Sequence, residues 1–278
     1  MEIRQLLIKN YHNIEQIRIN SSLKGGRYIT WIDEFIPNFS KELKKELYLL
    51  KQSIVYEPIT FRYTPKINKK SLLLREINEI QSLLLSADLA QYKTESICVK
   101  NATNFNELNT TEQHPAFAQS DTFFISPQHK ECLKTHTSAE QKNMFQKMRD
   151  IDPDKPLLCF HIGPCYRNDS SKRHLPKFHQ IEITSQNIEF KTFVDSITQL
   201  ISLYLGVEQS ELYIRRAYFP FVALGTEIDF REMEIAGLGI TRNSMFNLDP
   251  KKIYCASGFG IERLIMAKYN IKDINELL

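Results

Sequence analysis

The stretch C-Y-R-N-D-S-S-K-R-H-L-P-K-F-H-Q-I-E, Cys165 to Glu182, decides the fold of this chain. It joins a mostly apolar run, residues 156–167, through a basic, polar loop to an alternating run, residues 178–183. The alternation predicts a strand with Phe178, Gln180 and Glu182 on one face, in a hairpin that brings Arg167 nearby. An aromatic ring can stack on a base, a guanidinium can bind a phosphate, and a carboxylate can bind an ammonium. The solvated outer face of an antiparallel hairpin alternates in the same way, so these residues alone leave both interpretations open.

A second stretch near the end of the sequence reads C-A-S-G-F-G-I-E-R-L-I-M-A-K-Y, Cys255 to Tyr269. Gly258 and Gly260 permit a close turn from a strand into a helix. The apolar residues after the turn fall on one face of that helix, which carries Arg263 near its start. Two glycines are not a dinucleotide-binding fingerprint, so this stretch alone predicts only a strand, a turn and a helix.

Three further stretches accompany these two: N-F-N-E-L-N…H-P-A at 104–116, T-H-T-S at 135–138, and Y-F-P-F at 218–221. In order and spacing, the set resembles the class II aminoacyl-tRNA synthetases, and within them the family of phenylalanyl-tRNA synthetase α subunits. The resemblance covers roughly residues 68–278. It implies an α+β fold in which an antiparallel sheet is flanked by helices. Residues 1–67 form a separate small α/β appendage in this interpretation, with a glycine-bearing hairpin and a helix capped by Ser40.

The resemblance also implies an ATP site that uses Mg²⁺. Arg167 would bind the α-phosphate as a catalytic residue, and Arg263 would bind the γ-phosphate as a second one. His174 would reach the phosphates and Phe178 would stack on the adenine. Glu234 would bind the Mg²⁺ that bridges the β- and γ-phosphates.

The amino-acid site implied by the resemblance has two parts. Gln180 and Glu182 would hold the α-ammonium group of the substrate. The remaining residues would line the amino-acid pocket: His136, Ser138, Phe219, Phe221, Leu238 and Ala256. Local sequence allows simpler interpretations, namely a capping box from Ser138 to Gln141 and a core aromatic pair from the two phenylalanines.

Periodicity predicts the elements around these motifs. A helix over residues 69–85 buries Leu72, Ile77, Ile80 and Leu84, and corresponds in position to the dimer-interface helix of class II enzymes, although Ser96 stands where the family has its motif 1 proline. A second amphipathic helix is expected over 187–206. Strands are expected over 121–125 and 212–221, with Glu227 and Asp229 on the next strand.

Composition is that of an ordinary globular enzyme. The chain has 278 residues, a net charge of +3 and five scattered cysteines, which favour a reducing compartment and give no disulfide framework. No run of about 18 apolar residues and no signal peptide is visible, so we expect a cytoplasmic protein that does not associate with membranes. Cys159, His161 and Cys165 lack a second ligand pair, so we do not expect a zinc site.

Several residues depart from the family pattern. Phe117 and the loop residues Ser171, Lys172 and Arg173 are unusual, as is the run Val222-Ala223-Leu224-Gly225. Cys255 and Ser257 replace two aromatic residues, and Leu238 replaces a small one. We interpret these three changes as a rebuilt side-chain pocket, because each change of that size alters selection by about 1–3 kcal/mol.

Two functions of different class follow. In the first, the chain is the catalytic subunit of a phenylalanine–tRNA ligase, with a β-type partner. In the second, it is a freestanding paralogue that activates another amino acid and transfers it to a carrier protein or a small amine; a homodimer is the alternative to the β-type partner. The short N-terminal region, the end of the sequence soon after the stretch 255–269 and the pocket changes favour the second, whereas the overall similarity favours the first. A paralogue that only senses an amino acid is a third interpretation, but it would not need both Arg167 and Arg263.

Overall fold

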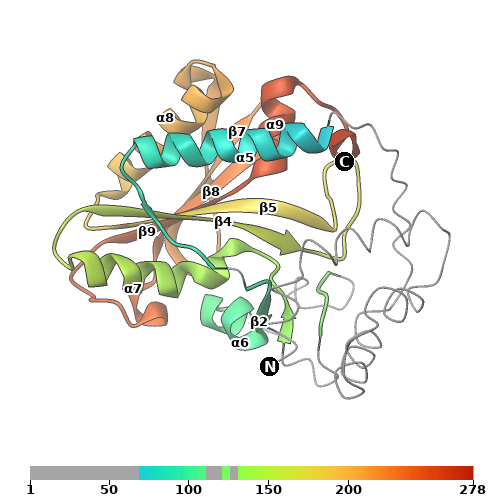
Figure 1. Cartoon of the computed structure of the whole chain (residues 1–278). Helices are drawn as coiled ribbons and strands as arrows, with labels where there is room; N and C mark the ends of the chain where they lie inside the picture. Colours follow the sequence, from blue (N-terminus) through green and yellow to red (C-terminus); the bar gives the residue numbers. More distant parts are fainter. Residues whose placement is uncertain (1–68, 95, 111–120, 126–130, 278) are drawn as a thin grey trace.

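The hairpin that contains Cys165 to Glu182 lies inside a seven-stranded sheet (Figure 1). We describe a computed structural model, in which residues 69–94, 96–110, 121–125 and 131–277 are described. The order of the strands is β1-β4-β5-β9-β8-β7-β6, and every neighbouring pair is antiparallel except β1 with β4. The strands are β1 (Ala90–Gln91), β4 (Leu157–Tyr166), β5 (Lys177–Gln186), β6 (Leu212–Ala217), β7 (Val222–Phe230), β8 (Met233–Thr241) and β9 (Tyr254–Gly260).

Helices cover both faces of this sheet. On one side lie α5 (Lys69–Ser86), α8 (Phe190–Leu205) and α9 (Ile261–Tyr269), and on the other lies α7 (Gln141–Ile151), as Figure 1 shows. The face toward the first three helices carries the largest apolar cluster, which we call the core face; it includes Ile181, Leu238 and Phe259. A two-stranded sheet of β2 (Cys98–Lys100) and β3 (Glu131–Leu133) lies beside α6 (Asn101–Asn104). The short 3-10 helices are η1 (Asn106–Leu108), η3 (Thr137–Glu140), η4 (Gln209–Glu211), η5 (Asn243–Phe246) and η6 (Ile274–Leu277).

The two predicted strands of the central hairpin are confirmed, and the second extends one residue before and three residues after the alternating run 178–183. They pair in one unbroken register in which Cys165 faces Phe178 and His161 faces Glu182. The hairpin is not a solvated outer surface, because Glu182 is only 1% exposed.

The predicted helix over 69–85 is confirmed as α5. Ile80 and Leu84 are buried, and Leu72 and Ile77 pack against the same cluster. The helix expected over 187–206 is α8, which begins only at Phe190. Its start was placed too early because Asn187 has φ 55°, a left-handed conformation that no α-helix contains.

Two other expectations about elements are wrong in part, and a third group is not tested. Residues 121–125 do not enter the central sheet: they form a single bridge, Phe124 to Cys132, beside β3. The strand expected over 212–221 ends at Ala217, and Pro220, which has no N–H to donate, lies in the connection to β7. The hairpin and Ser40-capped helix expected before residue 68, and the H-P-A motif with Phe117, lie outside the described residues.

Among the described residues, no helix combines the length and the apolar character that crossing a bilayer requires.

Candidate active site

The face of the sheet opposite the core face, which we call the site face, is lined by glycines. Gly163, Gly225, Gly237, Gly239 and Gly258 follow the alternation that places Gln180 and Glu182 on this side of β5. Side chains of the site lie directly against these glycines. A Cβ on Gly237 would come within 2.7 Å of the Phe219 ring, and one on Gly258 would come within 3.6 Å of Glu182 Oε2.

Glu182 is the centre of one half of the site. Its Oε2 accepts hydrogen bonds from Thr137 Oγ1 (2.9 Å) and Ser138 Oγ (3.1 Å), and its Oε1 accepts one from Gln141 Nε2 (2.6 Å). Within the described part of the chain, no cationic side chain forms an ion pair with this carboxylate. Burial raises the pKa of Glu182 to about 7, against the lowering effect of the three hydrogen bonds. The carboxylate therefore favours the arrival of a cation.

Gln180 lies beside Glu182 and is held by the same segment. Its Oε1 accepts a hydrogen bond from the backbone N–H of Thr137 at 3.0 Å. The amide oxygen is thereby fixed, and the amide nitrogen keeps its two donors.

The Thr137 segment owes its place to the turn before α7. The capping box predicted from Ser138 to Gln141 is wrong: Ser138 lies inside η3, α7 begins at Gln141, and neither helix has a side-chain cap. Because residues 137, 138 and 141 are spaced like one face of a helical turn, all three side chains point at Glu182. Sequence reasoning missed Thr137 and Gln141, although their i, i+4 spacing was a signal that could have identified them.

His136 precedes this turn in an extended conformation. Its Nδ1 is buried and has no hydrogen-bond partner among the described residues. Burial, together with the positive charge of Arg167, lowers the pKa of His136 to about 3, so the imidazole is neutral at pH 7. His136 thus lies beside the Thr137 segment and near the charge of Arg167, and its contact with an amino acid stays a prediction.

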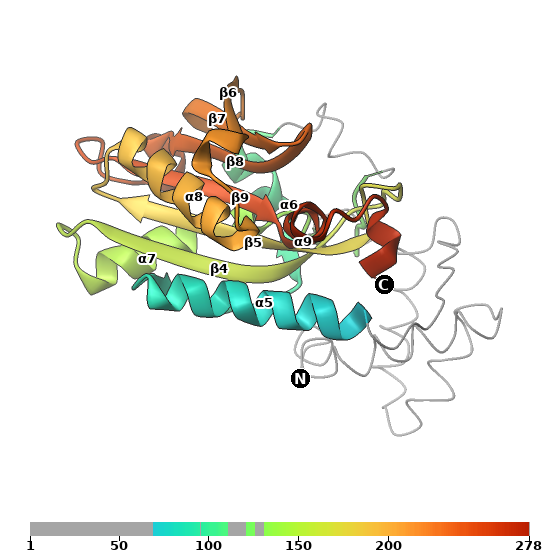
Figure 2. The ribbon, with the colours of Figure 1, turned by 90° about the horizontal axis from the view of Figure 1, so that it is seen from above.

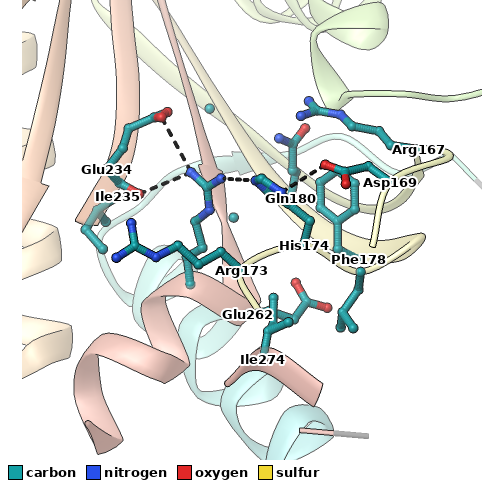
Figure 3. A pocket seen from close by; sticks show the side chains of 14 residues that line it. Arg167, Asp169, Arg173, His174, Phe178, Gln180, Glu234, Ile235, Glu262 and Ile274 are labelled. Carbon is teal, nitrogen blue, oxygen red and sulfur yellow. Dashed lines mark hydrogen bonds and ion pairs between the residues drawn. The ribbon is translucent and has the colours of Figure 1, made fainter. Parts of the chain in front are cut away.

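The other half of the site is a cavity of about 160 Å³ at the end of the hairpin (Figure 3). Its walls include Arg167, Phe178, Glu234 and Arg263. Arg167 donates from Nε to the Thr135 carbonyl at 3.0 Å, and its guanidinium lies 5.1 Å from the centre of the Phe178 ring. The face of the ring and two guanidinium groups thus border one cavity.

His174 connects the hairpin loop to α9. Arg263 Nη2 lies 3.0 Å from His174 Nε2, and His174 Nδ1 lies 2.9 Å from Asp169 Oδ2, the contact drawn in Figure 3. A guanidinium can only donate, so Nε2 is the acceptor and Nδ1 carries the proton in this arrangement. Arg263 also donates to Glu234, from Nη1 to Oε2 at 3.5 Å. The contacts of Arg263 with Glu234 are long and therefore weak, and a phosphate can replace them.

The two halves of the site are continuous. Gln180 and Gly258 line the cavity, and both also adjoin the Glu182 carboxylate or its hydrogen-bond partners. A ligand with a cationic end and a phosphate end could therefore occupy both halves at once.

Phe219 and Phe221 lie in the connection between β6 and β7. Their ring centres are 6.1 Å apart and the ring planes differ by 33°. Phe219 covers Gly225 and Gly237, so it stands on the site face. Ala256 faces Gly239 across β8 and β9, which puts its methyl group on the same face.

Leu238 is not part of this pocket. It is 1% exposed and belongs to the core-face cluster together with Cys255. Ser257 pairs directly with Leu238 across β8 and β9, so its side chain points the same way. The interpretation of these three residues as a rebuilt pocket is therefore wrong. Successive side chains of a strand point to opposite faces, and all three residues point away from the face that carries Gly237 and Ala256.

Comparisons with known proteins agree with this geometry. A family model described as "tRNA synthetases class II core domain (F)" matches residues 59–278. The phenylalanine–tRNA ligase alpha subunit of Ehrlichia ruminantium (strain Gardel) is 31% identical over 225 residues, which are 76% of this chain and 64% of that protein. The protein of the same name from Wolbachia sp. subsp. Drosophila simulans (strain wRi) is 29% identical over 259 residues, 87% of this chain and 73% of that one. The chain thus spans just under two thirds of the first of these relatives.

Solved structures give the same fold. The structure of pyrrolysyl-tRNA synthetase from Desulfitobacterium hafniense superposes with a TM-score of 0.62 at 18% identity, covering 85% of this chain and 80% of that one. The likeness confirms the α+β arrangement, an antiparallel sheet flanked by helices, that the sequence predicted.

Proposed function

The chain belongs to the class II aminoacyl-tRNA synthetase family, and from that membership we propose that it is the catalytic chain of an ATP-dependent ligase that activates phenylalanine. The activated product is the aminoacyl adenylate, which then passes its aminoacyl group to tRNA. One observation carries the proposal: Glu182, a buried carboxylate that has no cationic partner among the described residues, adjoins a cavity bordered by two guanidinium groups, Arg167 and Arg263.

The amino-acid end of the reaction is supported by the three hydrogen bonds to Glu182. They hold both carboxylate oxygens in place before a substrate arrives, so that binding costs little further conformational entropy. An α-ammonium group would supply the positive charge that the buried carboxylate lacks. The oxygen of Gln180 is fixed by the same segment and offers a second contact.

The nucleotide end is supported by the cavity around Phe178. In the proposed reaction, a carboxylate oxygen of the amino acid attacks the α-phosphorus of ATP, the bond to the bridging oxygen breaks, and pyrophosphate leaves. Arg167 would bind the α-phosphate as charge develops there, and Arg263 would bind the γ-phosphate. No protein nucleophile is required, so the residues would act by positioning and electrostatics.

Glu234 fits a Mg²⁺ ion that is shared with phosphates. Its carboxylate is exposed at the rim of the cavity, close to Arg263. Mg²⁺ is commonly held by one or two carboxylates together with substrate phosphates and water, so one protein carboxylate is compatible with the ion. When bound, the ion would supply positive charge for the β- and γ-phosphates.

Phenylalanine is favoured by the composition of the site face. The residues that face the pocket are small or aromatic: Gly237, Gly239, Ala256, Phe219 and Phe221. Small residues leave room for a flat side chain, and the two rings offer it aromatic edges and faces. The departures at Leu238, Cys255 and Ser257 lie on the core face and no longer argue for another amino acid.

The acceptor and the partners follow from the relatives. Both relatives described above are named phenylalanine–tRNA ligase alpha subunits. We therefore propose tRNA as acceptor, a β-type subunit as partner, and a cytoplasmic location. A non-tRNA acceptor or a homodimer remains the alternative, and it rests on the altered loop residues Ser171, Lys172 and Arg173 and on the altered run at residues 222–225.

The test is amino-acid-dependent exchange between ATP and pyrophosphate on the purified chain, with each of the twenty amino acids. Exchange with phenylalanine supports the proposal. Exchange with a different amino acid would show that phenylalanine is not the substrate, while the proposed reaction would stand. Charging of tRNA with and without a co-expressed β-type subunit then decides the acceptor.

The matched variants are Arg263→Ala and Lys191→Ala. Arg263 lines the cavity, whereas Lys191 lies on α8 and is 87% exposed in its side chain. Exchange should disappear in the first variant and persist in the second. Full exchange in Arg263→Ala would overturn the assignment of the nucleotide site.

A further inference from the structure

The loop between β4 and β5, residues 168–176, forms the outer wall of the nucleotide cavity. It supplies Asp169, Arg173 and His174 to the lining (Figure 3). Residues 169–173 are exposed and belong to no helix or strand. Inside the loop, the backbone N–H of Ser171 donates to the His174 carbonyl at 3.0 Å, which closes one tight turn. A turn of this kind does not fix the loop against the rest of the site.

The two ends of the loop are held elsewhere: the Asn168 N–H donates to the Asp121 carbonyl at 2.9 Å, and Leu175 is buried in the core-face cluster. The C-terminal segment binds the exposed middle of the loop. The backbone N–H of Ile274 donates to the Lys172 carbonyl at 2.9 Å. Asn275 Nδ2 lies 3.4 Å from the Ser171 carbonyl oxygen, and it also donates to Asp273 Oδ1 at 2.7 Å. The side chain of Ile274 is itself part of the cavity lining. Two neighbouring carbonyl groups of the loop are thus bound by two neighbouring residues some 100 positions later in the chain.

The segment is well placed to act as an anchor because it is fixed at both ends. Asn270, with φ 54°, ends α9 in a left-handed conformation and turns the chain back toward the hairpin. Ile274 and Leu277 are 2% and 1% exposed and belong to the core-face cluster. In Figure 2 the segment passes beyond α9 to the end of the sheet at which α5 begins, and η6 packs against α5.

We propose that residues 271–277 are a strap that holds the β4–β5 loop over the nucleotide cavity, and that Ile274 and Asn275 are positioning residues for ATP. The proposal rests on the proposed function only in naming ATP as the ligand. The strap keeps His174 beside Arg263 before the nucleotide arrives, so the loop does not have to be ordered on binding. It acts through two carbonyl groups of the loop and touches no reacting atom.

The sharpest test compares Ile274→Pro with Ile274→Ala. Both variants lose the same apolar side chain, but only proline also removes the N–H that binds the Lys172 carbonyl. Proline is tolerated at the first position of a helix, which Ile274 occupies in η6. The difference between the two variants therefore reports the strap hydrogen bond.

The first measurement is limited digestion with trypsin, which cleaves after Lys172 and Arg173. Both residues are exposed, so their protection depends on the conformation of the loop. We expect cleavage at these two sites to be about three- to tenfold faster in Ile274→Pro than in Ile274→Ala, the factor set by one hydrogen bond. The dissociation constant of Mg–ATP should rise by a similar factor, while the KM for the amino acid stays unchanged.

Asn275→Ala provides a second variant that does not touch the core, because Asn275 is exposed. Lys272→Ala, an exposed change in the same segment, is its control. Faster cleavage and weaker ATP binding in Asn275→Ala but not in Lys272→Ala support the strap. Equal cleavage in both pairs of variants overturns it.

Failure of the strap and failure of the proposed function are distinguishable. Digestion needs no nucleotide, so a difference in cleavage with no ATP binding in any variant would retain the strap and reject the ATP site. ATP binding of equal strength in all variants, with equal cleavage, would reject the strap and retain the site.

Discussion

The two faces of the central sheet carry opposite kinds of residue, although they are made from the same strands. On the core face, Leu238 and Phe259 pack under α8 and α9 in the largest apolar cluster. On the site face, Gly237, Gly239 and Gly258 leave the backbone open to the side chains of the site. Adjacent residues of β8 and β9 therefore have unrelated roles: one packs in the core, and the other, in the proposed function, faces the substrate.

This difference decides how departures from a family pattern are interpreted. A substitution in one of these strands bears on the substrate only if the alternation of side chains places it on the site face. Leu238, Cys255 and Ser257 fail that criterion, whereas Ala256 and Gly237 meet it. Each of the following experiments changes a residue on one of the two faces and compares the effect on activity with the effect on stability.

Arg167→Ala should give the largest effect. Removing the guanidinium from the cavity should lower the rate of adenylate formation by about 10³-fold or more, because it deletes positive charge where negative charge develops. Thermal unfolding should shift little, since the contacts of this side chain with the described residues are a hydrogen bond to the Thr135 carbonyl group and the approach to the Phe178 ring. Pyrophosphate exchange and calorimetry measure the two quantities. A variant that exchanges at the wild-type rate would remove Arg167 from the site.

Leu238→Ala should have the opposite signature. The side chain is fully buried on the core face, so its truncation should lower the free energy of unfolding by about 3–5 kcal/mol. The ranking of amino acids in pyrophosphate exchange should stay the same. Leu203→Ala, at a side chain that is 64% exposed, is the control and should change the stability little. A changed amino-acid preference in Leu238→Ala would mean that the two faces have been assigned wrongly.

Glu182→Gln tests the buried charge by its dependence on pH. Burial raises the pKa of Glu182 from 4.5 to about 7, so the folded state binds this proton more tightly than the unfolded state does. The wild-type protein therefore loses stability as the pH rises from about 4.5 to about 7, and glutamine does not share that loss. By linkage, the stability of the variant relative to wild type should rise by up to about 3 kcal/mol between pH 4 and pH 8.

Urea unfolding at the two pH values measures this change, with Glu232→Gln, at an exposed residue, as control. Exchange activity should be lost at both values, since glutamine offers no charge to an ammonium group. A stability difference that is the same at both pH values would show that Glu182 is ionised normally.

The sequence predicted the hairpin and α5 because both leave a local trace in the pattern of apolar residues. Alternation along β5 also places Gln180 and Glu182 on one face, but the roles of these residues and of the two arginines came from the family resemblance and stay predictions. The spacing of Thr137 and Gln141 could place them on one face of a turn, but it could not show that this face meets Glu182. Their role depends on where η3 comes to rest against β5, which is set by contacts between segments about 40 residues apart.

The same limit explains the errors. Local chemistry predicted a capping box at Ser138, but the Ser138 hydroxyl donates to Glu182 on another strand instead of to its own helix. Likewise, the sequence shows that Leu238 and Gly237 point to opposite faces of the strand. It does not show which of the two faces packs against the helices. That choice is made by the apolar faces of α8 and α9, once they pack on the sheet.

Gly237→Ala should give the smallest effect and the finest test of the site face. The added Cβ would lie 2.7 Å from Cζ of Phe219, so the ring has to move. We expect kcat/KM for phenylalanine to fall by about 10- to 100-fold, equivalent to about 1–3 kcal/mol, with the KM for ATP unchanged. Phe219→Leu shortens the opposing side chain, so the double variant should lose less than the two single losses added together. Strict additivity would mean that Phe219 and Gly237 do not meet, and the aromatic wall of the pocket would have to be sought elsewhere on the site face.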